Sequence, residues 1–206
     1  MKGSCYIVGA GDFFGFVKTP GPGDYVIAAD AGYKYCLAEK VTPDLVVGDF
    51  DSLGAAPDFP NIVKMPVEKD DTDTLHAMRI GLEKGYTRFE IYGGTGGKRP
   101  DHTIANLQCL LFLVKNGARG AMYGDGVLYT VIHNETLCLP PRSDGNISVF
   151  CLDGQASGVT LKGLKYPLND YTLSSDFPIG VSNSFTGSPA EISVKDGTLI
   201  LTYDIQ

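Results

Sequence analysis

The chain lacks the features that mark nucleic-acid-binding and membrane proteins. It has no run of Lys or Arg, and its 24 acidic residues outnumber its 17 basic ones, which gives a formal net charge of -7. A phosphate backbone would find no basic surface, so we expect no nucleic-acid partner. The longest apolar run, LQCLLFLV, is far shorter than the roughly 20 residues of a membrane helix. Gly and Asp interrupt the N-terminal sequence too early for a secretion signal, so we expect a cytoplasmic protein with no membrane segment.

Paired cysteines and clusters of Cys and His that could bind zinc are missing as well. The cysteines are odd in number and form no C-x-x-C motif: Cys5, Cys36, Cys109, Cys138 and Cys151. Neither a disulfide framework nor a zinc site is indicated, and we expect buried, reduced thiols. The three histidines are interpreted as structural residues: His76, His102 and His133.

Strand-like and helical patterns alternate in the first part of the chain and give way to strands in the second. In residues 74–84 the apolar side chains have helical spacing, with Thr72 or Asp73 as N-cap and Gly85 just beyond the end. Later runs such as GVLYTVIH, NISVFCLD and TLILTYDI are strand-like, and Asp196-Gly197 predicts a type I′ hairpin. We expect a mostly parallel, Rossmann-like α/β sheet domain at 1–130 and a small antiparallel sandwich or barrel at 131–206.

An early glycine motif, GAGDFFG, follows the first apparent strand. It resembles the fingerprint of a dinucleotide-binding fold, but its glycine spacing differs by one residue. The segment that follows it, DFFGFVKTPGPGDY, holds two prolines and several glycines. Such a segment cannot supply the helix whose N-terminus receives a pyrophosphate. We interpret the motif as a turn at the carboxyl end of the first strand.

Carboxylates gather in two short segments, VGDFDSLG and EKDDTDTLHA. Asp49 and Asp51 follow an apolar strand and share one face if the backbone stays extended. Like charges so close raise each other's pKa unless a cation offsets them, and carboxylates without imidazoles or thiolates suit Mg²⁺. Asp is also common in turns and at helix N-caps, so local hydrogen bonding explains either segment alone equally well.

A third segment, GGTGGKRPDHTIAN at residues 93–106, lies between a strand and a long helix. Glycines at the carboxyl end of a strand let backbone N–H groups approach phosphate oxygens. Lys98 and Arg99 add positive charge. Asp101 begins the next helix, where we expect it to act as N-cap and to face the site.

Together these segments resemble, in order and spacing, those of the thiamine pyrophosphokinase family. The resemblance rests on AADAG, PDLVVGDFDS, EKDDTD, GGTGGKRPDHTIAN, GLKYPL and GVSNSF, and it spans nearly the whole chain. Ala31 stands where the family usually has Gly. The glycine-rich segment carries one residue more than the family pattern, so either Lys98 or Arg99 takes the place of the family's arginine.

The resemblance implies an enzyme that transfers the diphosphoryl group of ATP to the hydroxyl of thiamine, with Mg²⁺, giving thiamine diphosphate and AMP. The implied fold is an α/β domain followed by a small β-sandwich. Asp49, Asp51 and Asp73 would hold Mg²⁺, with Asp70 nearby, Lys69 and Arg99 would neutralise charge, and Asp101 would position thiamine or its hydroxyl. The implied substrate-binding residues are Asp30, Asp71, Thr72, Gly94, Thr95, Gly96, Gly97, Lys98, Asn106, Ser182, Asn183 and Phe185.

The resemblance further implies a homodimer in which the thiamine pocket is shared between subunits. Ser182 and Asn183 would supply hydrogen bonds, and Phe185 would stack on the thiamine rings or, equally, would be a core residue. Two other functions are considered: a Mg²⁺-nucleotide sensor without turnover, and a dinucleotide-dependent oxidoreductase. Turnover of ATP with thiamine separates the enzyme from the sensor.

Overall fold

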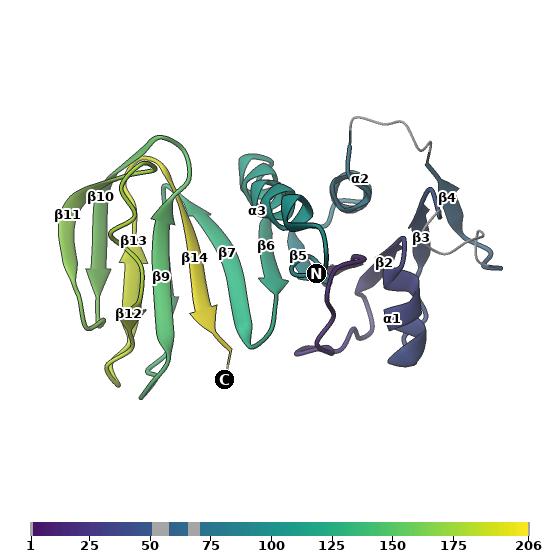
Figure 1. Cartoon of the computed structure of the whole chain (residues 1–206), viewed down its shortest axis with the longest axis horizontal. Helices are drawn as coiled ribbons and strands as arrows, with labels where there is room; N and C mark the ends of the chain where they lie inside the picture. The colour runs from purple at the N-terminus through teal and green to yellow at the C-terminus, as the bar shows by residue number, and fades with distance from the viewer. Residues whose placement is uncertain (1, 51–57, 66–70, 206) are drawn as a thin grey trace. The chain divides into compact units, whose positions relative to one another are not determined.

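A computed structural model describes residues 2–50, 58–65 and 71–205 of the chain (Figure 1). The predicted residues Asp51, Lys69 and Asp70 lie outside these ranges. The chain divides into two compact units, Met1–Asp125 and Gly126–Gln206.

The first unit is built on a parallel sheet. Its strands stand in the order β6-β5-β1-β2-β3-β4, and each neighbouring pair among them is parallel. The strand bounds are β1 Cys5–Val8, β2 Tyr25–Ala29, β3 Leu45–Gly48, β4 Ile62–Lys64, β5 Arg88–Tyr92 and β6 Arg119–Tyr123. Two of these strands, β1 and β3, are buried along their whole length, and β2 is buried except at Tyr25, as expected when both faces of a parallel sheet are covered.

Three helices follow the strands of this unit: α1 Gly32–Ala38, α2 Asp73–Glu83 and α3 Pro100–Lys115. The predicted helix at 74–84 is α2. Thr72 is its N-cap, because the Thr72 hydroxyl oxygen accepts a hydrogen bond from the Leu75 N–H at 3.2 Å. Within the described chain, residues 9–24 between β1 and β2 contain no helix, as their prolines and glycines predict. In the chain, α1 follows β2, α2 follows β4 and α3 follows β5. Open α/β sheets bind ligands at the carboxyl ends of their strands, where such helices begin.

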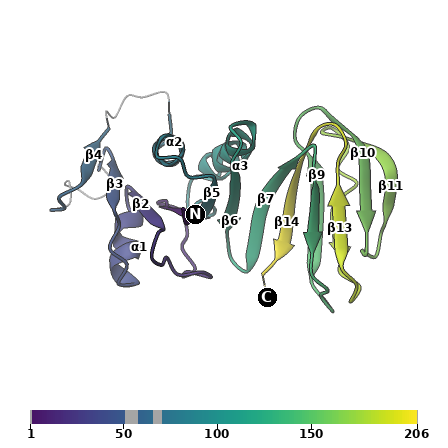
Figure 2. The same cartoon turned by 180° about the vertical axis from the view of Figure 1, so that it is seen from behind.

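The second unit is a β-sandwich (Figure 2). Its sheets have the orders β12-β9-β14-β7 and β11-β10-β13-β8, with antiparallel pairs. Apolar side chains from both sheets form one core, which includes Val149, Leu161 and Leu199. The strand bounds are β7 Val127–His133, β8 Thr136–Leu139, β9 Asn146–Cys151, β10 Gln155–Lys162, β11 Leu168–Ser174, β12 Asn183–Ser184, β13 Ala190–Ser193 and β14 Thr198–Asp204.

Three predictions need correction. The sheet structure of the chain is mixed rather than mostly parallel, because the parallel ladders belong to the first unit and the second unit is antiparallel. The Asp196-Gly197 turn makes no hairpin: β13 pairs with β8 and β10, whereas β14 pairs with β7 and β9, so the turn carries the chain from one sheet to the other. Cys138 is exposed, while the other four cysteines are buried, and all five are free thiols.

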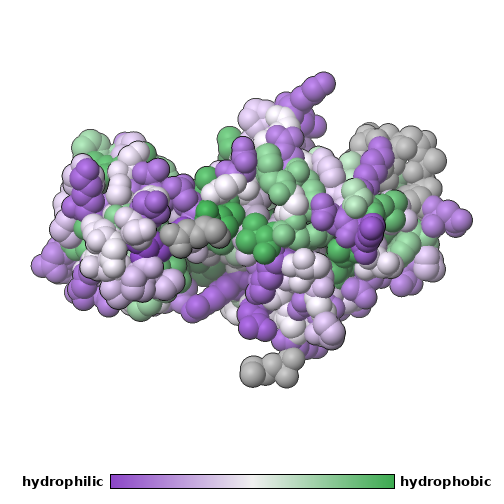
Figure 3. All heavy atoms as spheres, turned by 90° about the horizontal axis from the view of Figure 1, so that it is seen from below, coloured by the Kyte–Doolittle hydropathy of each residue, from purple (hydrophilic) through white to green (hydrophobic). Residues whose placement is uncertain are grey.

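Among the described residues, no helix is long and apolar enough to cross a membrane. The face in Figure 3 mixes hydrophilic and hydrophobic residues.

Candidate active site

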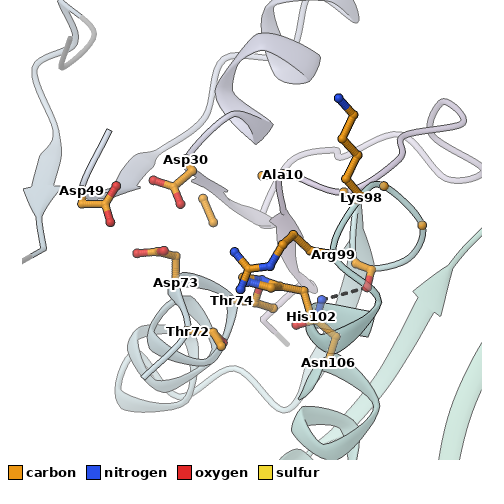
Figure 4. A pocket seen from close by; sticks show the side chains of 16 residues that line it. Ala10, Asp30, Asp49, Thr72, Asp73, Thr74, Lys98, Arg99, His102 and Asn106 are labelled. Carbon is orange, nitrogen blue, oxygen red and sulfur yellow. Dashed lines mark hydrogen bonds between the residues drawn. The ribbon is translucent and has the colours of Figure 1, made fainter. Parts of the chain in front are cut away.

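A cavity of about 340 Å³ opens at the carboxyl ends of the strands of the first unit (Figure 4). Its walls come from the turns after β1 and β2, the segment after β3, the start of α2, the glycine-rich loop after β5 and the start of α3. The lining residues are Ala10, Gly11, Ala29, Asp30, Asp49, Thr72, Asp73, Thr74, Gly93, Gly94, Gly96, Gly97, Lys98, Arg99, His102 and Asn106.

Three carboxylates from three different segments face one side of this cavity. Asp30 follows β2, Asp49 follows β3 and Asp73 begins α2, and Figure 4 shows their side chains directed toward a common space. Asp30 has a left-handed backbone conformation, with φ of 48°, and its N–H donates to the carbonyl of Val47 at 2.9 Å. The strand ends therefore bring together acidic residues that are far apart in the sequence.

Gly48 makes room for the Asp30 carboxylate. A Cβ atom at position 48 would lie 2.0 Å from Asp30 Oδ1, and the φ of Gly48 is 150°. The backbone N–H of Phe50 points at the same oxygen, at 3.5 Å. The glycine of the VGDFDS motif is thus required by the close approach of a side chain to the backbone.

Burial and neighbouring carboxylates favour the protonated form of Asp30. Burial is the largest cause that raises the pKa of Asp30 to about 7, and the hydrogen bond with Asp73 and the charges of Asp73 and Asp49 raise it further. The Asp30 carboxyl therefore holds a proton up to near neutral pH. A bound cation would replace this proton and remove the repulsion.

The donor chemistry of this cluster fits a hard divalent cation, because all of its ligands would be carboxylate oxygens. Among the described residues, however, no group of three or more His, Cys, Asp or Glu side chains already stands at metal-binding geometry. The third predicted ligand, Asp51, is outside the described ranges. The described carboxylates therefore match a hard divalent cation by the type of their ligand atoms.

The glycine-rich loop borders the other side of the cavity. Gly93, Gly96 and Gly97 have φ values of 63°, 70° and 75°, which favour glycine. The buried side chain of Asn106 reaches back from α3, and its Nδ2 donates to the carbonyl of Gly94 at 2.8 Å. Thr95 is buried and does not line the cavity.

Lys98 and Arg99 both line the cavity, so the structure brings both candidates for the family's arginine to the site. Arg99 is paired with Asp101, with Nη2 to Oδ2 at 2.7 Å and Nε to Oδ1 at 3.1 Å. This hydrogen bonding lowers the pKa of Asp101 below its ordinary value and raises that of Arg99. Asp101 does not cap α3 with its side chain, because the N-cap position is Arg99 and no side-chain cap bond is present there.

Two other predicted positions differ from expectation. Asp71 forms an ion pair with Arg79 and is not among the residues that line the cavity. His102, which was interpreted as structural, does line it. The spacing offered a signal, because His102 precedes Asn106 by four residues and positions i and i+4 share one face of a helix. The turn GAGD also contributes to the wall, through Ala10 and Gly11.

In the second unit, the side chain of Asn183 binds the backbone of Tyr166. The side chain is buried, its Oδ1 accepts from the Tyr166 N–H at 2.9 Å, and its Nδ2 donates to the Tyr166 carbonyl at 2.7 Å. Oδ1 also accepts from the Ser184 N–H at 2.9 Å. These bonds use the oxygen and one N–H of the amide to hold the backbone of Tyr166 and Ser184, and the hydrogen bond from Asn183 to a substrate stays a prediction.

Phe185 and Ser182 differ in their surroundings. Phe185 is only 5% exposed and belongs to the sandwich core, and the guanidinium of Arg142 lies 4.7 Å from its ring centre. Of the two interpretations of Phe185, the core residue fits this packing, and the stacking face does not. Ser182 is exposed, with φ of 59°, and its N–H donates to the hydroxyl oxygen of Ser148 at 3.0 Å.

Carboxylates and a glycine-rich loop at the strand ends of an α/β unit, followed by a β-sandwich, are typical of an enzyme that handles phosphate groups. The sequence model described as "Thiamin pyrophosphokinase, catalytic domain" matches residues 22–121, and that described as "Thiamin pyrophosphokinase, vitamin B1 binding domain" matches residues 135–199. The chain belongs to the thiamine pyrophosphokinase family.

Individual relatives agree with this assignment. The thiamine pyrophosphokinase of Bacillus subtilis (strain 168) is 29% identical over 189 residues, which cover 85% of each chain. A crystal structure of thiamine pyrophosphokinase from Bacillus subtilis has a TM-score of 0.88 at 25% identity, covering 99% of this chain and 100% of that one. Thiamin pyrophosphokinase from Candida albicans shares the fold, with a TM-score of 0.78 at 12% identity, covering 100% of this chain and 90% of that one.

Proposed function

We propose that the protein is a thiamine pyrophosphokinase, which transfers the diphosphoryl group of ATP to the hydroxyl of thiamine and releases AMP. The observation that carries the proposal is the cavity of the first unit, where Asp30, Asp49 and Asp73 face a space that the glycine-rich loop also borders. This arrangement suits a polyphosphate bound with a cation. The match of both family models along the chain supports thiamine as the acceptor.

In the proposed reaction the thiamine hydroxyl oxygen attacks the β-phosphorus of ATP, and the bond from that phosphorus to the oxygen bridging the α-phosphate breaks. The hydroxyl proton passes to a carboxylate of the cluster. Lys98 and Arg99 offset negative charge on the phosphates, and backbone N–H groups of the glycine-rich loop donate to phosphate oxygens. Most of the catalysis comes from positioning and electrostatics, because phosphoryl transfer needs little covalent chemistry from the protein.

Mg²⁺ is part of this proposal. Asp49 and Asp73 would hold the ion, together with Asp51 outside the described ranges, and Asp30 would lie beside them. When bound, the ion neutralises charge on the phosphate oxygens. Lys69 and Asp70 remain proposed site residues, and Asp101 would position the thiamine end, which requires it to share or leave Arg99.

The test is a single incubation with ATP, Mg²⁺ and thiamine, followed by chromatography of the products. Thiamine diphosphate and AMP in equal amounts are expected. Asp49→Asn and Asp73→Asn should each lower kcat at least about 100-fold, because an amide keeps the shape and removes the charge that a hard cation requires. Asp144→Asn, an exposed carboxylate of the second unit, is the matched control and should match the unmodified protein. ADP and thiamine monophosphate as primary products would refute the proposed reaction, and the absence of any turnover would favour the sensor.

A homodimer with shared sites completes the proposal, and its setting is the cytoplasm, where ATP is available and thiols stay reduced. Exposed Ser182 is the residue of the second unit offered to a partner's cavity. The test mixes Asp49→Asn with Ser182→Trp, each inactive alone. In a shared site every mixed dimer regains one complete site, so about a quarter of the unmodified activity should return on random exchange. Confirmed subunit exchange without recovered activity would show that each site lies within one chain.

A further inference from the structure

We propose that Asp12 is a positioning residue that fixes the glycine-rich loop 93–97 in the conformation that faces the cavity. The inference rests on the proposed function, in that it assigns the loop a phosphate-binding task. Asp12 belongs to the GAGD turn after β1, which none of the assigned catalytic or substrate-binding roles uses. It does not line the cavity itself.

Asp12 and the loop are joined by backbone and side-chain hydrogen bonds. The N–H of Gly11 donates to the carbonyl of Gly93 at 2.8 Å, and the N–H of Asp12 donates to the carbonyl of Thr95 at 2.8 Å. The side chain then completes the connection, because its Oδ2 accepts from the N–H of Gly97 at 2.8 Å. The carboxylate thus bonds to Gly97, the last residue of loop 93–97.

The backbone of the loop passes close to the Asp12 carboxylate at Gly96. A Cβ atom at Gly96 would lie 2.2 Å from Asp12 Oδ2 and 2.8 Å from Cγ. Gly96 and Gly97 both have positive φ, and glycine loses more conformational freedom on ordering than any other residue. A loop of this kind needs contacts from outside to remain in one conformation, and Asp12 supplies a side-chain contact to Gly97.

The residues next to Asp12 are held by a hydrogen bond and by aromatic packing. The carbonyl of Gly11 accepts from the Tyr35 hydroxyl at 2.9 Å, and the Phe13 ring stacks on Tyr35 with centres 5.0 Å apart and planes at 12°. Phe16 packs edge-on against Tyr92, with centres 4.9 Å apart. Aromatic packing therefore holds the segment between β1 and β2, and this segment in turn holds the loop through Asp12.

The proposal requires an acceptor at position 12 and does not require a charge. Asp12→Asn keeps an oxygen that can accept from Gly97, whereas Asp12→Ala removes it. If the carboxylate instead occupied an amide that phosphate needs, its removal would tighten ATP binding. The two variants therefore distinguish positioning from competition and from a purely electrostatic role.

Hydrogen exchange of the unliganded protein tests the contact independently of activity. Peptides covering residues 93–98 should exchange roughly three- to tenfold faster in Asp12→Ala, the range expected for loss of one hydrogen bond. They should stay within about twofold of the unmodified protein in Asp12→Asn and in the charge control Asp144→Ala. Unchanged exchange in a folded Asp12→Ala protein overturns the proposal.

Kinetics test the consequence. The KM for ATP should rise roughly three- to tenfold in Asp12→Ala with kcat within about twofold, since the loop acts on bound phosphate before and during the reaction alike. Asp12→Asn should restore most of the affinity. An Asn variant as impaired as the Ala variant, or an Ala variant that binds ATP more tightly, would also overturn the proposal. If the unmodified protein makes no thiamine diphosphate, the proposed function fails, while the exchange data still decide the role of Asp12.

A double-mutant cycle tests the contact between Asp12 and Gly96 directly. Gly96→Ala places a methyl group against the carboxylate and should impair ATP binding when Asp12 is present. In the Asp12→Ala background the methyl group meets no carboxylate, so the loss of ATP affinity caused by Gly96→Ala should be smaller. The remaining loss would come from the backbone strain of the positive φ at position 96. Equal losses in both backgrounds would show that residues 12 and 96 are not coupled.

Discussion

The raised pKa of Asp30 predicts an unusual pH dependence of stability. The pKa of Asp30 is raised from 3.8 to about 7 in the folded protein, so between these values the folded state holds a proton that the unfolded state has lost. Unfolding releases this proton, and the free energy of unfolding falls as pH rises through this window. Most paired carboxylates give the opposite slope. Asp30→Asn should therefore become relatively more stable than the unmodified protein as pH increases.

The magnitude follows from the window. Each pH unit corresponds to about 1.4 kcal/mol, so from pH 5 to pH 7 the full effect would be about 2.7 kcal/mol. Asp30 is only partly buried, and solvent screening reduces this to about 1–2 kcal/mol. Above pH 7 both states are ionised, and the difference between the two proteins should level off.

The assay is urea denaturation of the metal-free protein and of Asp30→Asn at half-unit steps from pH 5 to pH 8, with chelator present. The quantity to plot is the difference between their free energies of unfolding. Asp73→Asn provides a second control, because it removes the charge of Asp73 while burial of Asp30 remains, so the slope should become smaller. A difference that stays constant, or that favours the unmodified protein at high pH, would refute the raised pKa of Asp30. Added Mg²⁺ should raise the denaturation midpoint more at pH 8 than at pH 6.

Three further substitutions test individual contacts. Gly48→Ala should leave the protein folded but lower kcat by about 100-fold or more in the thiamine diphosphate assay, because the new Cβ displaces the Asp30 carboxylate. Asn106→Ala should lower the free energy of unfolding by about 1–3 kcal/mol in urea, since it leaves a buried carbonyl of the glycine-rich loop without its donor. Asn183→Ala should destabilise the sandwich by about 2–4 kcal/mol through loss of the Tyr166 clasp, seen as a lower Tm, and Asn183→Asp should be similarly destabilising because Tyr166 would lose its amide donor.

Local signals in the sequence predicted much of the first unit. The N-cap at Thr72 and the helix after it, the absent helix at 9–24 and the glycine-rich loop before α3 all follow from residues within a few positions of each other. These features depend on local geometry alone. The grouping of Asp49 with Asp73 was predicted from the family resemblance, because Asp73 begins a helix and the residues near it do not show which strand end it approaches.

Features that depend on distant contacts were missed. The Asp196-Gly197 turn carries a hairpin signal, yet its flanking strands find better partners in two different sheets. The contacts of Asn183 were missed because nothing near it in the sequence shows that its amide binds the Tyr166 backbone. Exposed Cys138 belongs to a short strand whose side chains alternate between the core and the surface, and the register could not be assigned from so few residues.

The carboxylate cluster and the glycine-rich loop explain each other physically. Asp30, Asp49 and Asp73 bring negative charge to one side of the cavity, and a polyphosphate would bring more, so a cation is needed between them. The loop offers neutral backbone donors and the nearby Lys98 and Arg99, which bind phosphate without needing a metal. A phosphate chain that spans the cavity would thus have one part against cation-bridged carboxylates and another against the loop. Because the loop carries no side chains at its glycines, its position must come from elsewhere, which is why the contacts of Asp12 and Asn106 matter as much to the site as the residues that touch substrate.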